Sequence, residues 1–226
     1  MADVSVAQEC NTLASDQVEF YHEHGYLRIP QVYSGDEISQ MADELDWQIE
    51  TWASKSQGWS GPWRHVYMDE ETEQQSKLIA LHDLHRYSKA WCDAVTHPRL
   101  AGALADLIGP NVELHHTTLH AKPPEPGHPF PMRQDWAFYK HEDSRYIDCL
   151  VHLDDTDDYN GCIRFLDASH KQGALEHVTE NLDGTNCTPH LPTDDWSIED
   201  TVPVPAKRGD VVVFSIHTIH GSRINQ

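Results

Sequence analysis

The sequence is short of positive charge. Its 226 residues include 16 Lys and Arg against 37 Asp and Glu, which gives a formal net charge of -21 with His neutral. A surface of this kind repels phosphate backbones and anionic lipid headgroups, so the charge argues against nucleic acid and membrane surfaces as partners. Net charge describes the whole surface, however, and a local basic pocket for a small anion remains open.

The chain also lacks a targeting segment, a membrane-spanning run and paired cysteines. The N-terminus MADVSVAQEC has neither the basic region nor the apolar region of a signal peptide. No apolar run approaches the ~20 residues that a membrane helix needs. The five cysteines are an odd number without a CxxC pair. We therefore expect a reduced, cytoplasmic protein.

The first half of the chain has helical periodicity. A helix is predicted from Ser15 to a stop at Gly25, followed by the short strand YLRIPQV. Ser34 and Glu37 form a capping box for a second helix that continues through Trp52. Residues 55–75 carry turn residues and acidic charge, which indicates a loop at a rim or lid, and a helical pair is predicted at 77–95 and 98–108.

The second half changes to a period of two. A strand is predicted over 112–120, and four further segments have the composition of short strands: DWAFY, YIDCLVHLD, CIRFLDAS and DVVVFSI. Helices followed by short strands predict an α+β protein with a double-stranded β-helix core, of the jelly-roll or cupin-like kind, and N-terminal helices packed on one sheet. We expect a single domain over 1–226, with residues 1–14 frayed.

The stretch FPMRQDWAFYKH, residues 130–141, is close to an iron-binding pattern. A facial triad of two His and one carboxylate leaves three open positions on Fe(II). Two such ligands commonly stand at i and i+2 of one strand, because a strand returns to the same face every second residue. Asp135 fits the carboxylate and His220, after the apolar strand DVVVFSI, fits the distant His. Arg133 stands where the first His would be.

Five segments in order make the chain similar to a known family: DQVEFYHEHGYLRIPQVYSGDEI, LIGPNVELHHTTLHAKPPEPG, QDWAFYKH, VHLDDTDDYNGCIRFLDASHKQG and GDVVVFSIHTIHGSRIN. The chain resembles the phytanoyl-CoA dioxygenase-like family of Fe(II)/2-oxoglutarate-dependent oxygenases over nearly its whole length. The resemblance implies a dioxygenase that uses Fe(II), 2-oxoglutarate as cosubstrate and dioxygen to hydroxylate a small organic substrate.

The resemblance also implies roles for individual residues. Asp135 and His220 would be the iron ligands and, with Arg133, the centre of the site. The residues implied in cofactor binding are Lys122, Gln134, Asn160, Ser169 and Ser222. Of these, Lys122 and Gln134 would contact the carboxylates of 2-oxoglutarate, and Asn160 and Ser169 would shape the site. His170 and Lys171 are further candidates, although ordinary hydrogen bonds could also hold their turn.

Two departures from the family pattern bear on activity. A guanidinium stays protonated and has no lone pair to offer, so Arg133 cannot replace a histidine ligand and is expected to pair with Asp135. The family also places an Arg about one strand beyond the HGS histidine, to grip the far carboxylate of 2-oxoglutarate. That final strand is expected to be missing, since the sequence ends at Gln226, and Arg223 is expected to point to the opposite face from His220.

Two alternatives to an active oxygenase remain open. The first is a non-catalytic module, or pseudoenzyme, that keeps the pocket and uses Arg133 to hold an anionic ligand. The second is a cupin-like metalloprotein with another divalent ion bound by His116, His120 and His220. Trp136 and Phe138 alternate with Arg133 and Asp135, which predicts that they lie in the core of the sandwich.

Overall fold

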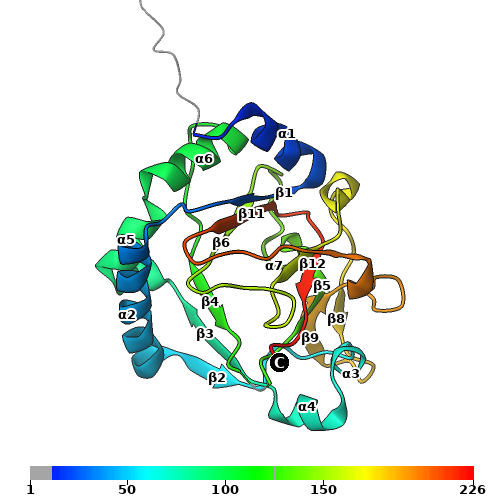
Figure 1. The fold of residues 1–226 in the computed structure, drawn as a ribbon. Helices are drawn as coiled ribbons and strands as arrows, with labels where there is room; N and C mark the ends of the chain where they lie inside the picture. The colour runs from blue at the N-terminus through cyan, green and yellow to red at the C-terminus, as the bar shows by residue number, and fades with distance from the viewer. Residues whose placement is uncertain (1–11, 125) are drawn as a thin grey trace, which may run out of the picture.

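Two antiparallel sheets form the centre of the protein (Figure 1). The computed structural model describes residues 12–124 and 126–226. One sheet has the order β1-β11-β6 and the other the order β10-β7-β12-β5. Their strands are β1 (Tyr26–Ile29), β11 (Val211–Ser215), β6 (Ile147–Val151), β10 (Val202–Pro203), β7 (Ile163–Phe165), β12 (His220–Ser222) and β5 (Phe130–Arg133).

Two smaller sheets extend this centre. The strands β2 (Ser54–Ser56), β3 (Leu78–His82) and β4 (Thr118–Ala121) form an antiparallel sheet, and β8 (Val178–Glu180) pairs with β9 (Asn186–His190). Neighbouring strands in every named pair are antiparallel. The pattern is the jelly-roll core with helices that the period-two segments predicted.

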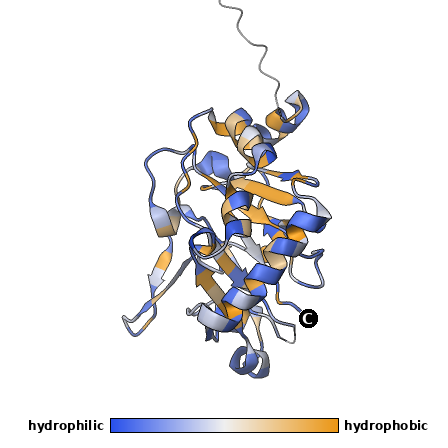
Figure 2. Cartoon of the chain, turned by 90° about the vertical axis from the view of Figure 1, so that its left-hand side faces the viewer, coloured by the Kyte–Doolittle hydropathy of each residue, from blue (hydrophilic) through white to orange (hydrophobic). Residues whose placement is uncertain are grey.

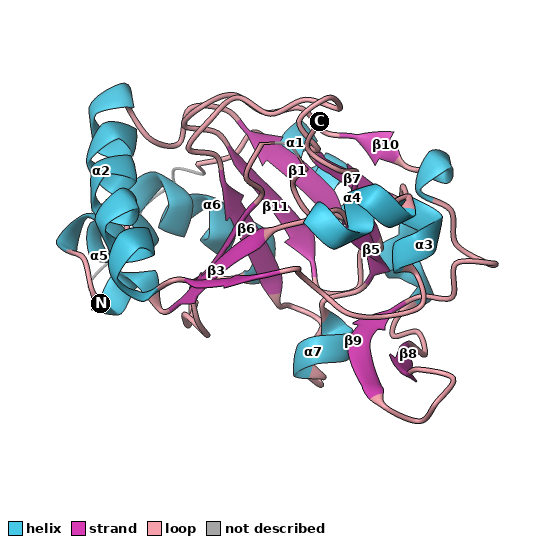
Figure 3. Ribbon diagram, turned by 90° about the horizontal axis from the view of Figure 1, so that it is seen from below, coloured by secondary structure: helices cyan, strands magenta, loops and turns pink. Residues whose placement is uncertain are grey.

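Four helices cover one side of the strands: α1 (Ser15–His24), α2 (Gly35–Trp52), α5 (Lys89–Val95) and α6 (Pro98–Ile108). Figure 3 shows α2, α5 and α6 together at one end of the molecule, with the β8 and β9 hairpin at the other. Residues of all four helices share one hydrophobic cluster with Leu27 and Ile29 of β1 and Val211 and Val213 of β11. The predicted packing of the N-terminal helices on one sheet is therefore confirmed.

Strand β11 separates this cluster from the interior of the roll. Val211 and Val213 face the helices, whereas Val212 and Phe214 belong to a second cluster with Phe165. The alternation follows from the period of two along a strand. Figure 2 shows hydrophobic residues concentrated on these central strands and hydrophilic ones on the outer helices. The interior end of the roll, next to Phe214 and Phe165, is where the candidate site lies.

The boundaries of the first two helices agree with their predicted signals. Helix α1 ends at Gly25, which takes a left-handed conformation with φ 85°. The side chain of Ser34 accepts from the backbone N–H of Glu37, and the Glu37 carboxylate accepts from the backbone N–H of Ser34. The capping box at the start of α2 is thus confirmed, as is α6 up to Gly109.

The single helix predicted over 77–95 is wrong. Its first part is strand β3, followed by a 3₁₀ turn (Leu84–Arg86) and then by α5. Residues 78–82 pair with β2 on one side and β4 on the other, so backbone pairing outweighs the local helical period. Strand β4 is shorter than predicted, because residues 112–117 form no regular element, and Val112 and Leu114 are exposed.

Residues 55–75 are more ordered than the predicted loop. They include the end of β2 and two short helices, α3 (Arg64–Tyr67) and α4 (Glu70–Gln75). The buried guanidinium of Arg64 holds this segment together, since it donates to the backbone oxygens of Gln57, Trp59 and Glu73 and pairs with the Glu73 carboxylate. Five donors in a rigid fork allow one Arg to join several turns.

The predicted strand DWAFY is a short helix instead, α7 (Trp136–Tyr139). Asp135 already has helical angles, φ -66° and ψ -19°, and Lys140 ends the helix in a left-handed conformation. The strand of this region lies earlier, at β5. The interpretation of Trp136 and Phe138 as sandwich core is also wrong, because neither is buried and Phe138 is 37% exposed.

Residues 12–14 are ordered, contrary to the predicted fraying of 1–14, and residues 1–11 lie outside the described part. The backbone N–H groups of Thr12 and Leu13 donate to the carboxylate of Asp106 on α6, and Leu13 is buried.

Among the described residues, no helix is both long enough and apolar enough to cross a membrane. The remaining secondary elements are two 3₁₀ turns (Ser169–Gln172 and Ile198–Asp200).

One buried histidine gives the fold a predictable dependence on pH. His128 is fully buried, and its Nε2 accepts from the backbone N–H of Trp59. Burial, with the nearby positive charge of Arg64, lowers the pKa of His128 from 6.5 to about 3. Between these values the unfolded chain binds a proton that the folded chain does not. The free energy of unfolding should therefore fall as the pH drops below ~6.5, by up to about 1.4 kcal/mol per pH unit from this group.

Urea denaturation of the native chain and of His128→Gln, measured from pH 4 to pH 7.5, isolates this contribution. The glutamine can still accept from Trp59 but does not titrate, so the difference in slope between the two proteins belongs to His128. Equal slopes would mean that His128 is not kept neutral by the fold.

Candidate active site

Three side chains of the predicted site converge at the interior end of the roll. Arg133 is the last residue of β5, and Asp135, two residues later, is the N-cap of α7. His220 is the first residue of β12 and lies opposite Arg133 in the antiparallel register. Asp135 Oδ1 lies 3.6 Å from Arg133 Nε and 3.4 Å from His220 Nε2. The predicted pairing of Arg133 with Asp135 is present, although Asp135 reaches its place from a turn and not from the same strand.

His220 is held in the orientation of a ligand. Its ring is 1% exposed and packs against Phe214 and Phe165. The Nδ1 atom lies 2.9 Å from the backbone oxygen of Thr218, so Nδ1 carries the proton and donates. Nε2 then faces Asp135 and has no hydrogen-bond partner among the described residues. A backbone contact that fixes the tautomer in this way is common for metal-binding histidines.

Arg133 fills the space beside this histidine. Its guanidinium carbon lies 4.7 Å from the ring centre of Trp59 and 5.1 Å from that of Phe130. Both contacts are in the range of cation–π attraction. Its one hydrogen bond within the described structure runs from Nη1 to the backbone oxygen of Pro131, at 3.3 Å. The guanidinium is thus held by cation–π contacts and by the charge of Asp135, while most of its N–H donors have no acceptor among the described residues.

A second carboxyl group, that of Asp148 on β6, completes the charged cluster. The side chains of Asp135 and Asp148 lie within hydrogen-bonding reach of each other. Burial and the charge of Asp135 raise the pKa of Asp148 well above its usual value. Burial opposes ionisation of Asp135 too, but His220 and Arg133 outweigh it and lower the pKa of Asp135. The cluster therefore has one carboxylate beside Arg133 and one carboxyl group that keeps its proton more readily.

Lys122 also lies near Phe130, with Nζ 5.3 Å from the centre of that ring. The ammonium donates to Ser222 Oγ and to the backbone oxygens of Gly161 and Arg223. Burial and the charge of Arg133 lower the pKa of Lys122 to about 7. All three N–H donors of Lys122 are in use, so its side chain joins the turn at Gly161 to the segment at Ser222 and Arg223. To contact 2-oxoglutarate, as predicted, Lys122 would have to give up one of these three hydrogen bonds.

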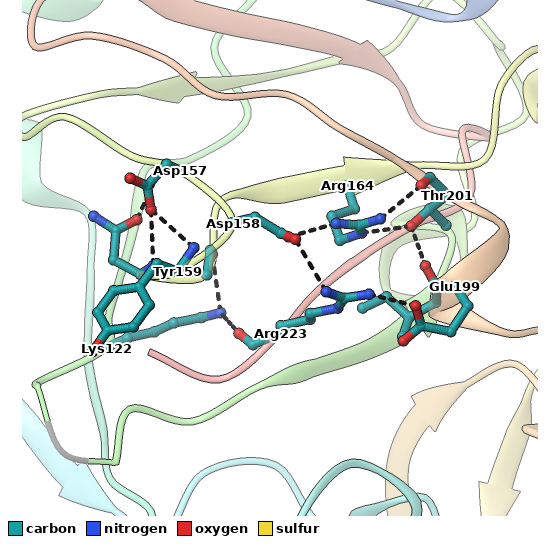
Figure 4. A network of polar contacts seen from close by, with 11 residues as sticks. Lys122, Asp157, Asp158, Tyr159, Arg164, Glu199, Thr201 and Arg223 are labelled. Carbon is teal, nitrogen blue, oxygen red and sulfur yellow. Dashed lines mark hydrogen bonds and ion pairs between the residues drawn. The ribbon is translucent and has the colours of Figure 1, made fainter. Parts of the chain in front are cut away.

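Arg223 does not face the iron-site residues. Figure 4 shows its guanidinium between the carboxylates of Asp158 and Glu199, while Asp158 also pairs with the buried Arg164. Arg164 donates in addition to the side chain and backbone oxygens of Thr201. The network joins three segments at the edge of β7 and engages both Nη atoms of Arg223 away from the iron-site residues, as expected from its position on the opposite face.

The other predicted cofactor residues mainly organise the backbone. Gln134 is fully buried, and its side chain bonds to the backbone of Gly173, Leu175 and His217. Asn160 accepts from the backbone N–H of Asp157, and Ser169 Oγ accepts from that of Ile219 next to His220. Ser169 and Gln134 thus hold the segment that leads into β12, and their predicted contacts with the cosubstrate remain untested.

The turn at 169–172 is held by ordinary hydrogen bonds. His170 Nε2 contacts the backbone oxygen of His22, and the backbone of Lys171 donates to Ala168. Neither residue contacts the charged cluster described above. The roles suggested for His170 and Lys171 in the site therefore find no support in these contacts.

The alternative metal site of His116, His120 and His220 is wrong. The described residues contain no group of three or more His, Cys, Asp or Glu side chains that could hold a metal ion. His116 bonds instead to Tyr139 and His115. His120 packs against Trp59 and Phe130.

Sequence reasoning missed three residues of the site: Trp59, Phe130 and Asp148. Asp148 had a signal, since a carboxylate in the otherwise apolar strand segment YIDCLV is costly unless it is paired. Trp59 had only the general expectation of a rim at 55–75. Its contact with Arg133 depends on how Arg64 folds that segment, which no local pattern reveals.

Comparison with known proteins identifies the family. A family model described as phytanoyl-CoA dioxygenase (PhyH) matches residues 21–226. The chain belongs to the phytanoyl-CoA dioxygenase family. A probable alpha-ketoglutarate-dependent hypophosphite dioxygenase of Stutzerimonas stutzeri is 26% identical over 217 residues, 93% of this chain and 73% of that protein. The peroxisomal phytanoyl-CoA dioxygenase of Rattus norvegicus is 27% identical, over 96% of this chain and 65% of the length of the rat protein.

Solved structures share the fold of this chain. The alpha ketoglutarate-dependent carbocyclase SnoK from nogalamycin biosynthesis superimposes with a TM-score of 0.75, at 22% identity, over 94% of this chain and 78% of its own. EctD from S. alaskensis, crystallised with 2-oxoglutarate and 5-hydroxyectoine, gives a TM-score of 0.69 at 21% identity, over 95% and 71% of the two chains. The double-stranded β-helix core with added helices that was predicted for this chain is therefore confirmed.

The family's iron does not fit the residues present here. Asp135 and His220 are arranged as two ligands would be, but the position of a third belongs to a guanidinium, which has no lone pair to donate. That guanidinium lies close enough to Asp135 to compete with a metal for the same oxygen. The absence of any group of three candidate ligands in the described residues agrees with this conclusion.

Replacing Lys122 by Met should destabilise the protein, because three buried oxygens would lose a charged donor. We expect a loss of about 2 kcal/mol in the free energy of unfolding, measured by urea denaturation at pH 6. Lys207→Met is the matched control, since the Lys207 side chain is exposed and its ammonium pairs with the exposed Asp155; it should cause little change. Equal effects of the two replacements would contradict the structural role of Lys122.

Proposed function

We propose that this chain is a non-catalytic member of the phytanoyl-CoA dioxygenase family, which binds a small organic carboxylate in the family's pocket without iron. The observation that carries the proposal is the position of Arg133 between Trp59, Phe130 and Asp135. A planar guanidinium held by aromatic rings is well suited to bind a carboxylate through two parallel hydrogen bonds.

The charges of the site support this role. Side-chain exposure is 12% for Arg133 and 16% for Asp135, so both are largely buried and a small part of each is exposed to solvent. Most N–H groups of Arg133 have no acceptor in the described structure, and leaving charged donors unmatched away from water is costly. A carboxylate ligand would satisfy these donors. The family's own cosubstrate, 2-oxoglutarate, is the first candidate to test, because it carries two carboxylates of suitable size.

A second candidate function is the iron-dependent hydroxylation of a small molecule, as in the dioxygenases to which the chain is similar. The orientation of His220, with Nδ1 bound to Thr218 and Nε2 directed at Asp135, favours it. When bound, iron would supply the oxidising chemistry, and Asp135 and His220 would hold it. This function requires the Arg133 side chain to leave its place between the rings, and another donor to replace it.

Isothermal titration calorimetry without metal, with EDTA present, tests the binding proposal. The native chain should bind 2-oxoglutarate or a related small carboxylate, and Arg133→Met should weaken that binding by at least about 10-fold, because a charge-assisted hydrogen-bond pair is lost. Arg133→Lys should retain part of the affinity, since it keeps the charge and loses the fork.

Arg99→Met is the control, because the Arg99 side chain is on the surface of α6 and its guanidinium donates to the backbone oxygen of Gln31, away from the site. It should bind as the native chain does. Two results would refute the proposal: unchanged affinity in Arg133→Met, or binding by the native chain only when Fe(II) is added.

A further inference from the structure

Three aromatic side chains form a cluster on the outer surface of the protein. Trp47 and Trp52 lie in the last two turns of α2, which runs along the outside of the molecule (Figure 1), and Tyr87 follows the 3₁₀ turn Leu84–Arg86. The ring centres of Trp47 and Trp52 are 4.7 Å apart, and those of Trp52 and Tyr87 are 4.8 Å apart. Although the rings touch, the exposed fractions of the three residues are 49%, 46% and 48%. A single exposed aromatic residue is ordinary, but several in contact usually mark an interaction surface.

The aromatic cluster has an acidic rim. Four exposed carboxylates lie within one turn of Trp47 on α2: Asp43, Glu44, Asp46 and Glu50. Residues three or four apart on a helix are neighbours on its surface, so this rim borders the ring of Trp47. None of the four carboxylates is in an ion pair within the described part of the chain.

The end of α2 adds to the negative potential at the aromatic cluster. The C-terminus of a helix carries a partial negative charge, which a basic side chain in the last turn often compensates. The last turn of α2 contains no basic residue. Beside Tyr87, the guanidinium of Arg86 is paired with the carboxylate of Asp83. The rim carboxylates and the helix end are therefore left without a compensating cation.

These features identify the chemistry of the partner. An aromatic centre with a polar rim is the usual anatomy of a protein interface. A second copy of this chain would bring the same carboxylates, and a further net charge of -21, against the rim, so repulsion opposes self-association. A cationic segment suits both parts of the surface. Its charges complement the carboxylates, and guanidinium groups stack on aromatic rings.

We propose that the aromatic cluster and its acidic rim bind a basic polypeptide segment of a partner protein. Arginine side chains of that segment stack on the rings of Trp47, Trp52 and Tyr87 and pair with the carboxylates of α2. The inference is separate from the proposed function, which concerns Arg133 and its neighbours.

Synthetic peptides that differ only in their charged residue test this on the native chain. The probes are RAARAARAA, KAAKAAKAA and QAAQAAQAA, each with a fluorescent label, and fluorescence anisotropy at low ionic strength gives the affinities. The arginine peptide should bind about 3-fold more tightly than the lysine peptide, because a guanidinium stacks better on an aromatic ring. The glutamine peptide should not bind. Equal affinities for the arginine and lysine peptides would overturn the proposal, since charge alone would then explain the binding.

The double variant Trp47→Ala/Trp52→Ala assigns the binding to the aromatic cluster. It should bind the arginine peptide at least about 5-fold more weakly, because two exposed cation–π contacts of about 2- to 5-fold each are lost. Tyr159→Ala is the matched control. Tyr159 is 67% exposed and follows two aspartates, but its ring contacts no other aromatic ring among the described residues. An equal loss of affinity in Tyr159→Ala would contradict the assignment.

A charge-matched pair of variants tests the acidic rim. Glu44→Gln/Glu50→Gln removes two carboxylates beside the cluster and should weaken binding of the arginine peptide by about 3-fold. Glu70→Gln/Glu71→Gln makes the same change in net charge on the exposed helix α4 and should leave the affinity unchanged. Equal weakening in both variants would show that the peptide responds only to net charge.

Sedimentation velocity of the native chain without peptide tests the other occupant. The native chain should sediment as the double variant Trp47→Ala/Trp52→Ala does. A native dimer that dissociates in the double variant would assign the aromatic cluster to a second copy and overturn the proposal. The peptide comparison on the native chain needs no variant to fold, so the proposal can be refuted even if the double variant is unstable.

Discussion

The site depends on one constraint: Arg133 places a positive charge where a metal site would have a side chain with a lone pair to donate. The end of β5, the turn to α7 and the start of β12 bring Arg133, Asp135 and His220 together as a metal site would. A guanidinium cannot ligate a metal, and its charge repels one. The neighbouring groups are consistent with this charge: two aromatic rings hold it, and the carboxylate of Asp135 compensates it.

The surrounding fold is shared with the solved structures to which the chain is similar, and several of its contacts position the backbone and ring of His220. Thr218 orients the ring of His220, and Ser169 holds the backbone before it. Lys122 ties β12 to the turn at Gly161. These contacts fix backbone and ring positions without regard to what occupies the centre, which is why one substitution can change the chemistry of the site while the architecture persists.

Much of the fold was predictable from local patterns. The capping box at Ser34, the stop at Gly25 and the apolar strand ending near Ser215 depend on neighbouring residues, and all three were predicted. The segments 77–95 and 135–139 were not, because Leu78–His82 is a strand through pairing with β2 and β4, and Asp135 starts a helical turn where its composition favours a strand. Non-local pairing decides such cases.

The site too was predictable only where local sequence patterns determine it. Asp135, His220 and the conflict at Arg133 followed from the motif and from the chemistry of the guanidinium. Trp59 and Asp148 come from distant segments that only the folded chain brings to Arg133. The aromatic and acidic surroundings of Arg133 are therefore a property of the folded structure.

The most direct test of the account is metal binding by the native chain and by Arg133→His. Mn(II), a spectroscopic substitute for Fe(II), can be titrated into each protein under identical conditions while electron paramagnetic resonance follows the signal of the free ion. The account predicts that the native chain leaves Mn(II) free at concentrations that fill the variant, and that Asp135→Asn in the variant abolishes its binding. Equal Mn(II) affinity in the native chain and the variant would contradict it.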